Sequence, residues 1–357
     1  MKTIVFCWSG ISGYMAACWR ELMRRPGLKV HVLAFAPHGD GRQVAFDERV
    51  MAGIPGRLLD PAARKDVEGM RREIVALKPD YVVFPGWMHQ PYRELAARLH
   101  RDGIPLVLTI DTPWWGTPRQ HLGRFLLRRY IRLFTAVFVP GERAWQYAWR
   151  LGFPASRIGR GLYGVDVAGL MPVLGQRESR PWPRRFLFVG RYAPVKGLDV
   201  LVAGYRRYRE LVGDPWELAC CGRGPEAARI AREPGVVDLG FLQPEELKAQ
   251  WGGAGAFVLP SRFDPWPLVL VEAAAAGLPL LASDACGSAV EVLRPHYNGW
   301  SFPAGDPDAL AQVMRRCHEQ HARLPEMGQR SQTLAAPYSA ECWAERWEQQ
   351  LFAFPSR

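Results

Sequence analysis

The sequence has no run of 18 or more apolar residues, so no membrane-spanning helix is predicted. Its seven cysteines include no C-x-x-C pair and no zinc-ligand spacing, which favours buried thiols in a reducing cytoplasm. The apolar part of the opening residues, MKTIVFCWSG, is too short for a signal peptide and is predicted to be a strand. With 48% hydrophobic and 23% charged residues, the 357-residue chain is predicted to form two globular domains.

Acidic residues are scarce in the first half of the chain. Residues 1–170 hold 25 Lys and Arg against 14 Asp and Glu, whereas residues 171–357 hold 21 of each. The whole net charge of +11 therefore lies in the first half. A basic half-molecule indicates an anionic partner, which is a lipid head group, a phosphorylated acceptor or nucleic acid.

The chain also lacks the dinucleotide-binding pattern G-x-G-x-x-G. Its first strand, residues 3–8, is followed by a turn with G-x-x-G spacing that ends at Gly13. This turn is either a phosphate-facing glycine loop of a Rossmann-like domain or an ordinary strand-to-helix turn. Further strands are predicted at 29–35, 81–85, 106–110 and 136–139, with helices at 66–77, 91–101, 118–133 and 142–151. Alternating apolar strands and helices predict a parallel sheet covered on both faces.

Several side chains follow these strands, where ligands of parallel sheets bind. The carboxylate of Asp111 could hydrogen-bond a ligand hydroxyl or stabilise positive charge, and it could equally begin a helix or an Asx turn. The aromatic side chains after these strands could form a platform for an acceptor or could pack in the core. They are Trp87, His89, Trp114 and Trp115.

Residues 119–134, RQHLGRFLLRRYIRLF, combine a basic stripe with apolar side chains. Arg124, Arg128 and Arg132 are spaced four residues apart, as on one face of a helix. The segment is either an amphipathic helix at an anionic membrane surface or a packing helix with a solvated basic edge. In the first case membrane contact would be peripheral at most.

A second strand-to-helix unit begins at residue 185, after a Pro- and Gly-rich stretch, residues 171–183, that is predicted to be an interdomain linker. Arg191 and Lys196 lie in its loop, next to a predicted helix start. Two cations in that position suit a diphosphate, and the alternative is a solvated basic loop.

Residues 257–287 form another such unit. Asp264 lies in the loop, and Glu272 lies eight residues later inside the predicted helix. The amides of Leu268 and Val269 begin that helix, where free N–H groups and the positive end of the dipole favour phosphate. The alternative is a buried helix with a chance pair of acids.

These patterns together resemble the retaining glycosyltransferases of family 4. The resemblance rests on Asp264 and Glu272 before E-A-x-A-x-G-L-P, on G-R-x-x-x-x-K-G at 190–197 and on G-x-G-P at 222–225. It implies an α/β GT-B fold, with two Rossmann-like parallel-sheet domains that face a central cleft. Residues 1–172 would bind the acceptor, residues 173–338 would bind the nucleotide sugar, and a last helix at about 339–357 would pack back onto the first domain.

The resemblance also implies roles for single residues. The expected catalytic residues are Asp111, Asp264, Arg191 and Lys196. The donor would contact Gly13, Arg191, Lys196, Gly224, Leu242, Asp264, Leu268, Val269 and Glu272, and the acceptor would contact Trp87, His89, Trp114 and Trp115. Three positions depart from the family pattern, with Asp for Glu at 264, Pro for Gly at 267 and Asp for His at 111.

The expected activity is transfer of a sugar, with retention of configuration, from a nucleotide-diphosphate sugar to a hydroxyl in bacterial polysaccharide or glycolipid synthesis. No metal or other cofactor is expected, and Asp306-x-Asp308, the one D-x-D, is interpreted as a helix cap. The alternatives are a nucleotide-sugar-binding subunit without turnover and another GT-B enzyme, such as an epimerase or a phosphorylase. A nucleic-acid-binding role for the basic half would need a recognisable module, and none is present.

Overall fold

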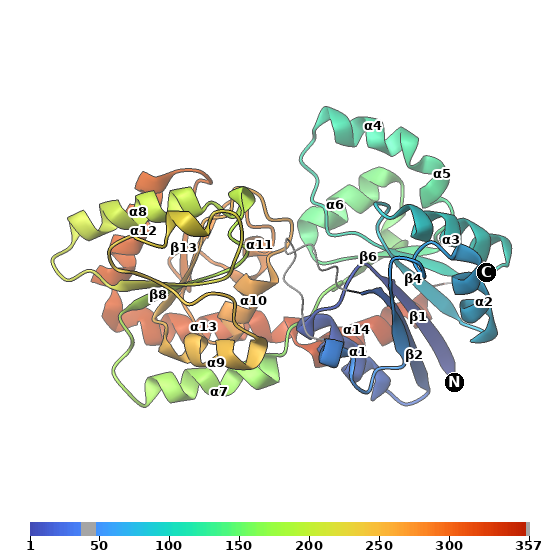
Figure 1. The fold of residues 1–357 in the computed structure, drawn as a ribbon, viewed down its shortest axis with the longest axis horizontal. Helices are drawn as coiled ribbons and strands as arrows, with labels where there is room; N and C mark the ends of the chain where they lie inside the picture. Colours follow the sequence, from blue (N-terminus) through green and yellow to red (C-terminus); the bar gives the residue numbers. More distant parts are fainter. Residues whose placement is uncertain (37–47, 355–357) are drawn as a thin grey trace. The chain divides into compact units, whose positions relative to one another are not determined.

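The computed structural model describes residues 1–36 and 48–354, and the chain divides into two compact units (Figure 1). Unit 1 comprises Met1–Val165 and Ala340–Arg357, and unit 2 comprises Asp166–Ser339. The division falls at Val165 and not at residue 172, and the predicted linker over 171–183 is wrong. Most of that stretch belongs to helix α7 (Val167–Glu178), in which Leu170, Val173 and Leu174 are buried at helical spacing despite Pro172.

Unit 1 contains a seven-stranded parallel sheet in the order β3-β2-β1-β4-β5-β6-β7. Its strands are β1 (Lys2–Trp8), β2 (Leu28–Phe35), β3 (Gly56–Leu59), β4 (Tyr81–Pro85), β5 (Leu106–Thr109), β6 (Ala136–Val139) and β7 (Ile158–Arg160). Its helices are α1 (Gly13–Met23), α2 (Val67–Ala76), α3 (Gln90–Arg101), α4 (Pro118–Leu126), α5 (Arg128–Ile131), α6 (Glu142–Leu151) and α14 (Ala340–Ala353).

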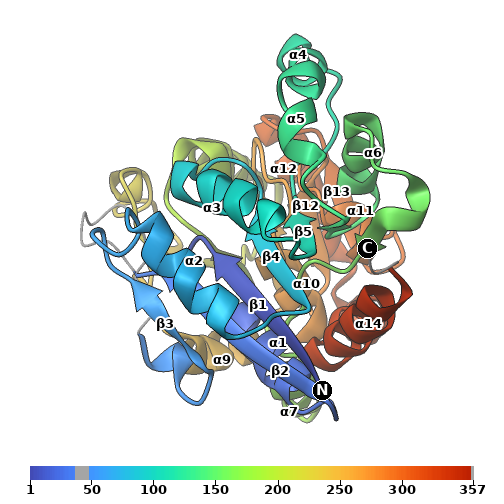
Figure 2. The ribbon, with the colours of Figure 1, turned by 90° about the vertical axis from the view of Figure 1, so that its right-hand side faces the viewer.

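Helices cover both faces of this sheet, because side chains alternate between the faces along each strand. In β1, Phe6 and Trp8 belong to a core with α1 and α14, whereas Val5 and Cys7 belong to a core with α2, α3 and α6. Figure 2 shows the strands of unit 1 between these two helical layers. The predicted α/β class and parallel sheet are confirmed.

Helix α14 belongs to unit 1 and is held there by tryptophans. Trp347 stacks on Phe138 of β6 at 3.9 Å between ring centroids, and its indole N–H donates to the carbonyl of Gly161 at 2.9 Å. Trp343 donates in the same way to Leu162 at 2.9 Å. Two large side chains that bury rings and satisfy their N–H groups explain why this helix packs here. The last three residues of the helix predicted over 339–357 lie outside the described residues.

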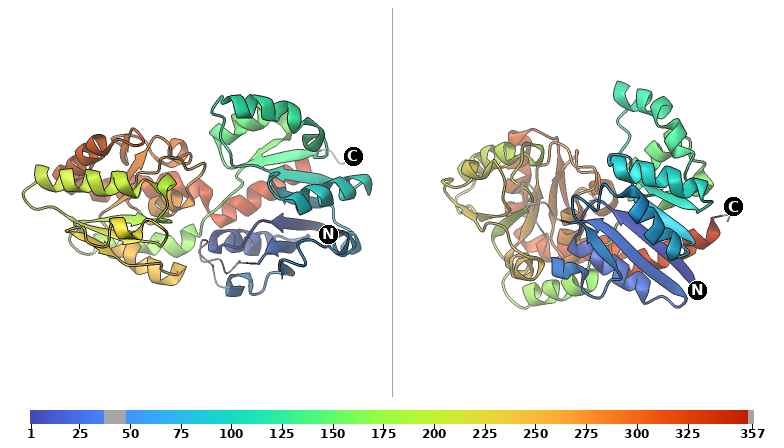
Figure 3. Two further views of the ribbon diagram at one scale, coloured as in Figure 1. Left: turned by 45° about the horizontal axis from the view of Figure 1, so that its top comes forward. Right: turned by 45° about the vertical axis from the view of Figure 1, so that its right-hand side comes forward.

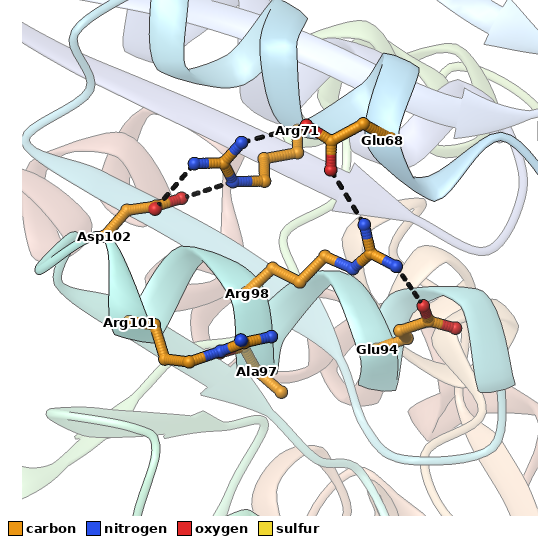
Figure 4. A pocket seen from close by; sticks show the side chains of 7 residues that line it. All are labelled: Glu68, Arg71, Glu94, Ala97, Arg98, Arg101 and Asp102. Carbon is orange, nitrogen blue, oxygen red and sulfur yellow. Dashed lines mark hydrogen bonds and ion pairs between the residues drawn. The ribbon is translucent and has the colours of Figure 1, made fainter.

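A charged hollow lies on the surface between α2 and α3 (Figure 4). Arg71 donates to both carboxylate oxygens of Asp102 at 2.7 Å and to Glu68 at 2.9 Å. Arg98 donates to Glu68 at 2.7 Å and to Glu94 at 2.6 Å. Because these charges are paired with one another, the hollow serves to join the two helices.

Unit 2 contains a six-stranded parallel sheet in the order β10-β9-β8-β11-β12-β13. Its strands are β8 (Arg185–Val189), β9 (Glu217–Cys221), β10 (Val236–Asp238), β11 (Ala256–Leu259), β12 (Leu280–Ser283) and β13 (Gly299–Phe302). Its helices are α7, α8 (Leu198–Leu211), α9 (Pro244–Gly253), α10 (Leu268–Ala275), α11 (Ala289–Val292), α12 (Pro307–Glu319) and α13 (Leu324–Ala335).

Two helical layers also cover this sheet, with α8 and α12 on one face and α7, α9, α10 and α13 on the other (Figure 3). The fully buried Arg177 of α7 explains why that helix belongs to unit 2. Its guanidinium donates to the carbonyls of Gly277 at 2.8 Å, Ala276 at 3.1 Å and Trp251 at 2.6 Å. It thereby satisfies carbonyls at the ends of α9 and α10 that would otherwise be unpaired.

Some element boundaries differ from the prediction. The helix predicted at 118–133 is interrupted at Leu127 and continues as the short α5. Strand β10 ends at Asp238, so Leu242 lies in the following loop. The short edge strands β3 and β7 were not predicted, because three or four residues carry little periodic signal.

Candidate active site

The strand order of unit 2 indicates where a ligand binds. The chain runs outward in one direction from β8 to β9 and β10, and in the other from β11 to β12 and β13, so the order reverses between β8 and β11. In open parallel sheets, ligands bind beyond the carboxyl ends of the strands at such a reversal. Arg191 and Lys196 follow β8, and Asp264 follows β11, so the predicted site residues lie at this position.

Lys196 and Asp264 contact each other directly. The Lys196 ammonium forms an ion pair with Oδ2 of Asp264, and the two side chains are only 15% and 10% exposed. The sequence places these residues in separate loops and does not predict the pair. In this state each charge compensates the other, so the loop that would meet a diphosphate is joined to the loop that would meet a sugar.

Backbone contacts hold these two loops together. The amide of Arg262 donates to the carbonyl of Val195 at 2.8 Å. Gly197 has a φ of +68°, and a Cβ atom there would lie 2.2 Å from the carbonyl oxygen of Pro260. Only glycine fits this close approach in a left-handed conformation. The glycine of the G-R-x-x-x-x-K-G sequence is therefore needed to bring Lys196 to the end of β11.

The N-terminus of α10 has no side-chain cap. Its N-cap residue is Pro267, whose side chain makes no capping hydrogen bond, so the first amides of the helix, at Leu268 and Val269, have no capping acceptor. Ser288 fixes this turn by donating from Oγ to the carbonyl of Pro267 at 2.9 Å. An uncapped helix start in a partly exposed loop is suited to bind an anion.

Glu272 lies in α10, as predicted. Its carboxylate makes no hydrogen bond or ion pair with any of the described residues. It is partly buried, and this burial raises the pKa of the carboxyl from its usual 4.5 to about 7. A half-buried acceptor without a donor is suited to bind a ligand that brings hydroxyl groups.

The remaining predicted donor residues of unit 2 lie in neighbouring loops. Arg191 is exposed, and its guanidinium has no ion-pair partner within residues 1–36 and 48–354. The loop with Gly224 is joined to the Arg191 loop, because the amide of Tyr192 donates to the carbonyl of Arg223 at 2.9 Å. Leu242 is partly exposed in the loop before α9.

In unit 1, Asp111 follows β5 and accepts a hydrogen bond from the buried hydroxyl of Tyr163 at 3.1 Å. Burial, together with the negative charge of Asp111, raises the pKa of Tyr163, which keeps the phenol protonated as the donor. The alternative in which Asp111 is a helix N-cap is wrong, because Thr117 caps α4. Gly13 is the first residue of α1, and Ser12 caps that helix.

The predicted acceptor residues of unit 1 differ in exposure. Trp87 and Trp114 pack against the core, and both contact the ring of Tyr147, at 6.2 and 5.6 Å between centroids. Trp115 is 43% exposed, with the Arg143 guanidinium 5.7 Å from its ring. His89 packs edge-on against Phe35 at 5.0 Å, and burial lowers the pKa of its imidazole.

No three His, Cys, Asp or Glu side chains within residues 1–36 and 48–354 are arranged to hold a metal ion. Asp306 caps α12 by accepting from the amide of Ala309 at 2.9 Å, as the sequence predicts. In the same part of the chain, no helix combines the length and apolarity needed to cross a bilayer.

Both units match known protein families. The model described as "Glycosyl transferase 4-like domain" matches residues 9–159, and the model "Glycosyl transferases group 1" matches residues 183–320. HepE from Anabaena, solved with UDP and glucose, aligns with a TM-score of 0.73 over 99% of this chain and 100% of its own, at 16% identity. This chain has the GT-B glycosyltransferase fold.

Two curated glycosyltransferases show the sequence relationship of this GT-B chain. It is 30% identical over 220 residues to the amylovoran biosynthesis glycosyltransferase AmsK of Erwinia amylovora, covering 57% of this chain and 53% of AmsK. It is 27% identical over 325 residues to the GDP-mannose-dependent alpha-mannosyltransferase of Mycobacterium tuberculosis, with 82% of each chain covered. The chain thus spans about half the length of AmsK and most of the mannosyltransferase.

Two features of this GT-B protein have no signal in its sequence. Tyr163 lies 52 residues from Asp111 in the chain, and only the position of β7 beside β6 brings its hydroxyl to the end of β5. Ser288 lies 21 residues from Pro267, whose carbonyl it binds. Tyr163 lies between Gly161 and Gly164, and Ser288 follows Gly287, but neither glycine pattern indicates which group the side chain contacts.

Proposed function

We propose that the protein is a retaining, metal-independent glycosyltransferase that moves a sugar from a nucleotide-diphosphate sugar to an acceptor hydroxyl. One observation carries the proposal. The Lys196–Asp264 ion pair lies beyond β8 and β11, where the strand order reverses, and the uncapped start of α10 follows Asp264 in the chain. Unit 2 would bind the donor, and unit 1 would bind the acceptor.

The donor would be held through its diphosphate and ribose. Arg191 and Lys196 would pair with phosphate oxygens, and the amides of Leu268 and Val269 would donate to the same group. Glu272, which has no hydrogen-bond donor among residues 1–36 and 48–354, would accept hydrogen bonds from the ribose hydroxyls. The nearby loops with Gly224 and Leu242 would contact the nucleoside. HepE was solved with UDP and glucose, and the mycobacterial relative is named for GDP-mannose, which supports a nucleotide sugar as donor.

The reaction would break the bond between the anomeric carbon and the diphosphate oxygen. The acceptor oxygen would form the new bond on the same face of the sugar, and its proton would pass to the departing phosphate oxygen. Arg191, Lys196 and the two amides would stabilise the charge that grows on the diphosphate. Asp264 would hold a sugar hydroxyl while remaining near the Lys196 ammonium. The roles predicted for Asp111 and Gly13 of unit 1 rest on the sequence resemblance alone.

The acceptor and setting follow from the composition of unit 1 and from the relatives. Its basic charge and its partly exposed aromatic residues suit a phosphorylated or lipid-linked glycan. Trp87, His89, Trp114 and Trp115 would form the contact surface. AmsK acts in amylovoran biosynthesis, and a role in bacterial polysaccharide or glycolipid synthesis is proposed here by similarity. All seven cysteines are free thiols, which fits a cytoplasmic location.

The test is a transfer assay followed by NMR of the product. Purified protein would be given UDP-, GDP-, ADP- or dTDP-sugars with a panel of phosphorylated and lipid-linked acceptors, with and without EDTA. The proposal predicts a product whose anomeric coupling matches the donor, formed equally in EDTA. An inverted product would refute the retaining reaction, and loss of activity in EDTA would refute metal independence. Donor binding without release of the nucleoside diphosphate would identify a binding subunit.

A further inference from the structure

Helix α4 exposes its apolar side chains. Leu122, Phe125 and Leu126 are 59%, 76% and 72% exposed, and their spacing of three and four residues places them on one face. The one buried residue of α4 is polar, since Gln120 donates to the carbonyl of Pro113 and accepts from the amide of Trp115, both at 2.8 Å. The apolar face of α4 is therefore exposed to solvent, and its buried residue is polar. A core helix shows the reverse arrangement.

The inner side of this segment is well packed. Tyr130 and Ile131 of α5 are buried in the core of unit 1, and Gly123 of α4 lies near the hydroxyl of Tyr147 in α6. In Figures 1 and 2, α4 lies at the outer margin of unit 1, beyond α5 and α6. The alternative in which residues 119–134 form a packing helix with a solvated basic edge is wrong for α4, because Leu122, Phe125 and Leu126 are exposed.

The charged side chains of the segment that carries this apolar face have a single sign. Residues 112–141 contain no Asp or Glu. The arginines of α4, α5 and the residue after α5 are all exposed, and they are Arg119, Arg124, Arg128, Arg129 and Arg132. We use the name α4 surface for these five arginines together with Leu122, Phe125 and Leu126. Its partner must offer both apolar volume and negative charge.

We propose that the α4 surface docks on a lipid bilayer that contains anionic head groups. The apolar side chains would enter the boundary between head groups and acyl chains, while the arginines would remain among the phosphates. Trp115 at the start of α4 is 43% exposed and suits the same depth, because tryptophan favours membrane–water interfaces. Binding would be peripheral and reversible.

Other occupants fit less well. A second copy of the chain, paired through the same surface in a symmetric dimer, would bring two sets of five arginines together without an acid. A nucleic acid would offer phosphate to the arginines but no apolar volume to Leu122 and Leu126. A bilayer supplies both an apolar interior for Leu122, Phe125 and Leu126 and anionic head groups for the arginines.

The docking does not depend on the transfer reaction, but its consequence rests on the proposed function. A transferase held at the bilayer by unit 1 would meet an acceptor that is itself lipid-linked. Vesicle binding is therefore measured without donor or acceptor, and nucleotide-sugar binding is measured separately on the same protein. Failure of one result leaves the other intact.

The experiment is co-sedimentation with vesicles of phosphatidylcholine alone or with 30% phosphatidylglycerol, at 0.1 and 0.5 M salt. The wild type is expected to bind the anionic vesicles at low salt and to lose most of that binding at high salt. Phe125→Ser with Leu126→Ser should lower the partition coefficient at least tenfold. Arg124→Glu with Arg128→Glu should lower it by at least tenfold as well, at roughly fivefold for each arginine removed.

Matched controls lie in unit 2. Met171→Ser with Leu211→Ser replaces two apolar residues that are 54% and 42% exposed, and Arg232→Glu with Arg316→Glu reverses two exposed arginines. Both control pairs should change vesicle binding less than twofold. All of these positions are exposed, so circular dichroism and thermal unfolding should match the wild type.

Three results would overturn the proposal. The first is no binding of the wild type to anionic vesicles at 0.1 M salt. The second is equal binding by the α4 and control variants. The third is self-association or DNA binding that the Phe125 and Arg124 variants abolish, without any vesicle binding, since this would assign the α4 surface to another occupant.

Discussion

Lys196 and Asp264 form an ion pair across the two loops that follow β8 and β11, although they lie 68 residues apart in the sequence. Both side chains are largely buried, and both come from the two sequence patterns that most resemble the family 4 glycosyltransferases. The pair joins a residue proposed to bind the diphosphate to one proposed to bind the sugar. Donor binding would therefore change the environment of both the Lys196 ammonium and the Asp264 carboxylate.

The first prediction concerns the strength of this pair. Removing one partner leaves a mostly buried charge without its counterion, so Lys196→Met and Asp264→Asn should each destabilise the fold by about 1–3 kcal/mol. A double-mutant cycle in urea should give a coupling free energy above about 1 kcal/mol. The exposed pair Arg184–Asp214 is the matched control, and its coupling should be near zero. Equal coupling for the two pairs would contradict this.

The second prediction concerns the pH dependence of Glu272. Burial raises the pKa of its carboxyl from 4.5 to about 7 in the folded protein. Between these two pH values the folded protein holds a proton that the unfolded chain has released. Its contribution to stability is present below pH 4.5 and is lost as pH rises through 7. Glu272→Gln should therefore be more stable than wild type by up to about 3 kcal/mol at pH 8 and equally stable at pH 4.

The same substitution should weaken donor binding, because an NH2 group replaces one of the two carboxylate oxygens proposed to accept from the ribose and the negative charge is lost. Chemical denaturation at both pH values, with nucleotide-sugar titration at pH 8, measures both effects. Glu210→Gln, in an exposed position of α8, should change neither quantity. A Glu272→Gln variant that is less stable than wild type at pH 8 would show that the carboxylate has a favourable partner.

The third prediction concerns Arg191, which is exposed and unpaired among the described residues. Arg191→Ala should leave the free energy of unfolding within about 0.5 kcal/mol of wild type. It should weaken the binding of a nucleoside diphosphate by roughly 10- to 100-fold, as expected for charged hydrogen bonds. Calorimetric titration measures the affinity, and Arg232→Ala is the control. An unchanged affinity would remove Arg191 from the site.

The fourth prediction concerns Gly197. Alanine there must adopt a φ of +68° with its Cβ 2.2 Å from the carbonyl of Pro260, so the two loops must separate. Gly197→Ala should cost about 1–3 kcal/mol and should reduce donor affinity, because Lys196 moves with the loop. Gly213→Ala has open space around it and should be neutral. Lower stability with unchanged donor affinity would show that this loop does not contribute to donor binding.

Much of the fold could be predicted from the sequence, because long apolar strands and helices repeat their period several times. The strand Tyr81–Pro85 has the same bounds in prediction and structure, and Glu272 lies in its predicted helix. The linker prediction was wrong because Pro172 and the nearby glycines are typical of a linker, although Leu170, Val173 and Leu174 form the buried face of a helix. The edge strands β3 and β7 were too short to carry a pattern.

The site was predicted in part, for a related reason. Local patterns identified Lys196 and Asp264 separately, since each lies in a loop with its own signature. Their ion pair depends on β8 and β11 being neighbours, and the sequence contains no record of strand order. Tyr163 and Asp111 meet for the same kind of reason. The outward face of α4 could not be assigned either, because its burial depends on where the helix lies.

The fifth prediction concerns Tyr163, whose hydroxyl donates to Asp111. If Asp111 contacts the donor sugar, Asp111→Asn should lower the transfer rate by roughly 100-fold or more. Tyr163→Phe keeps the buried ring and removes one hydrogen bond, so we expect about a tenfold lower rate, with the affinity for free nucleoside diphosphate unchanged. Steady-state kinetics and titration separate these effects. Equal losses in rate and in diphosphate affinity would indicate a structural role only.

The most direct test of donor binding in unit 2 is a calorimetric titration with UDP-, GDP-, ADP- and dTDP-sugars. It compares the wild type, Glu272→Gln and Arg191→Ala, and nucleoside diphosphate release is followed in the same samples. We expect saturable binding of one nucleotide class, weaker binding in both variants, and release of its diphosphate once an acceptor is present. Two results would contradict donor binding in unit 2. One is that both variants bind every donor as tightly as the wild type does, and the other is that the wild type binds no donor.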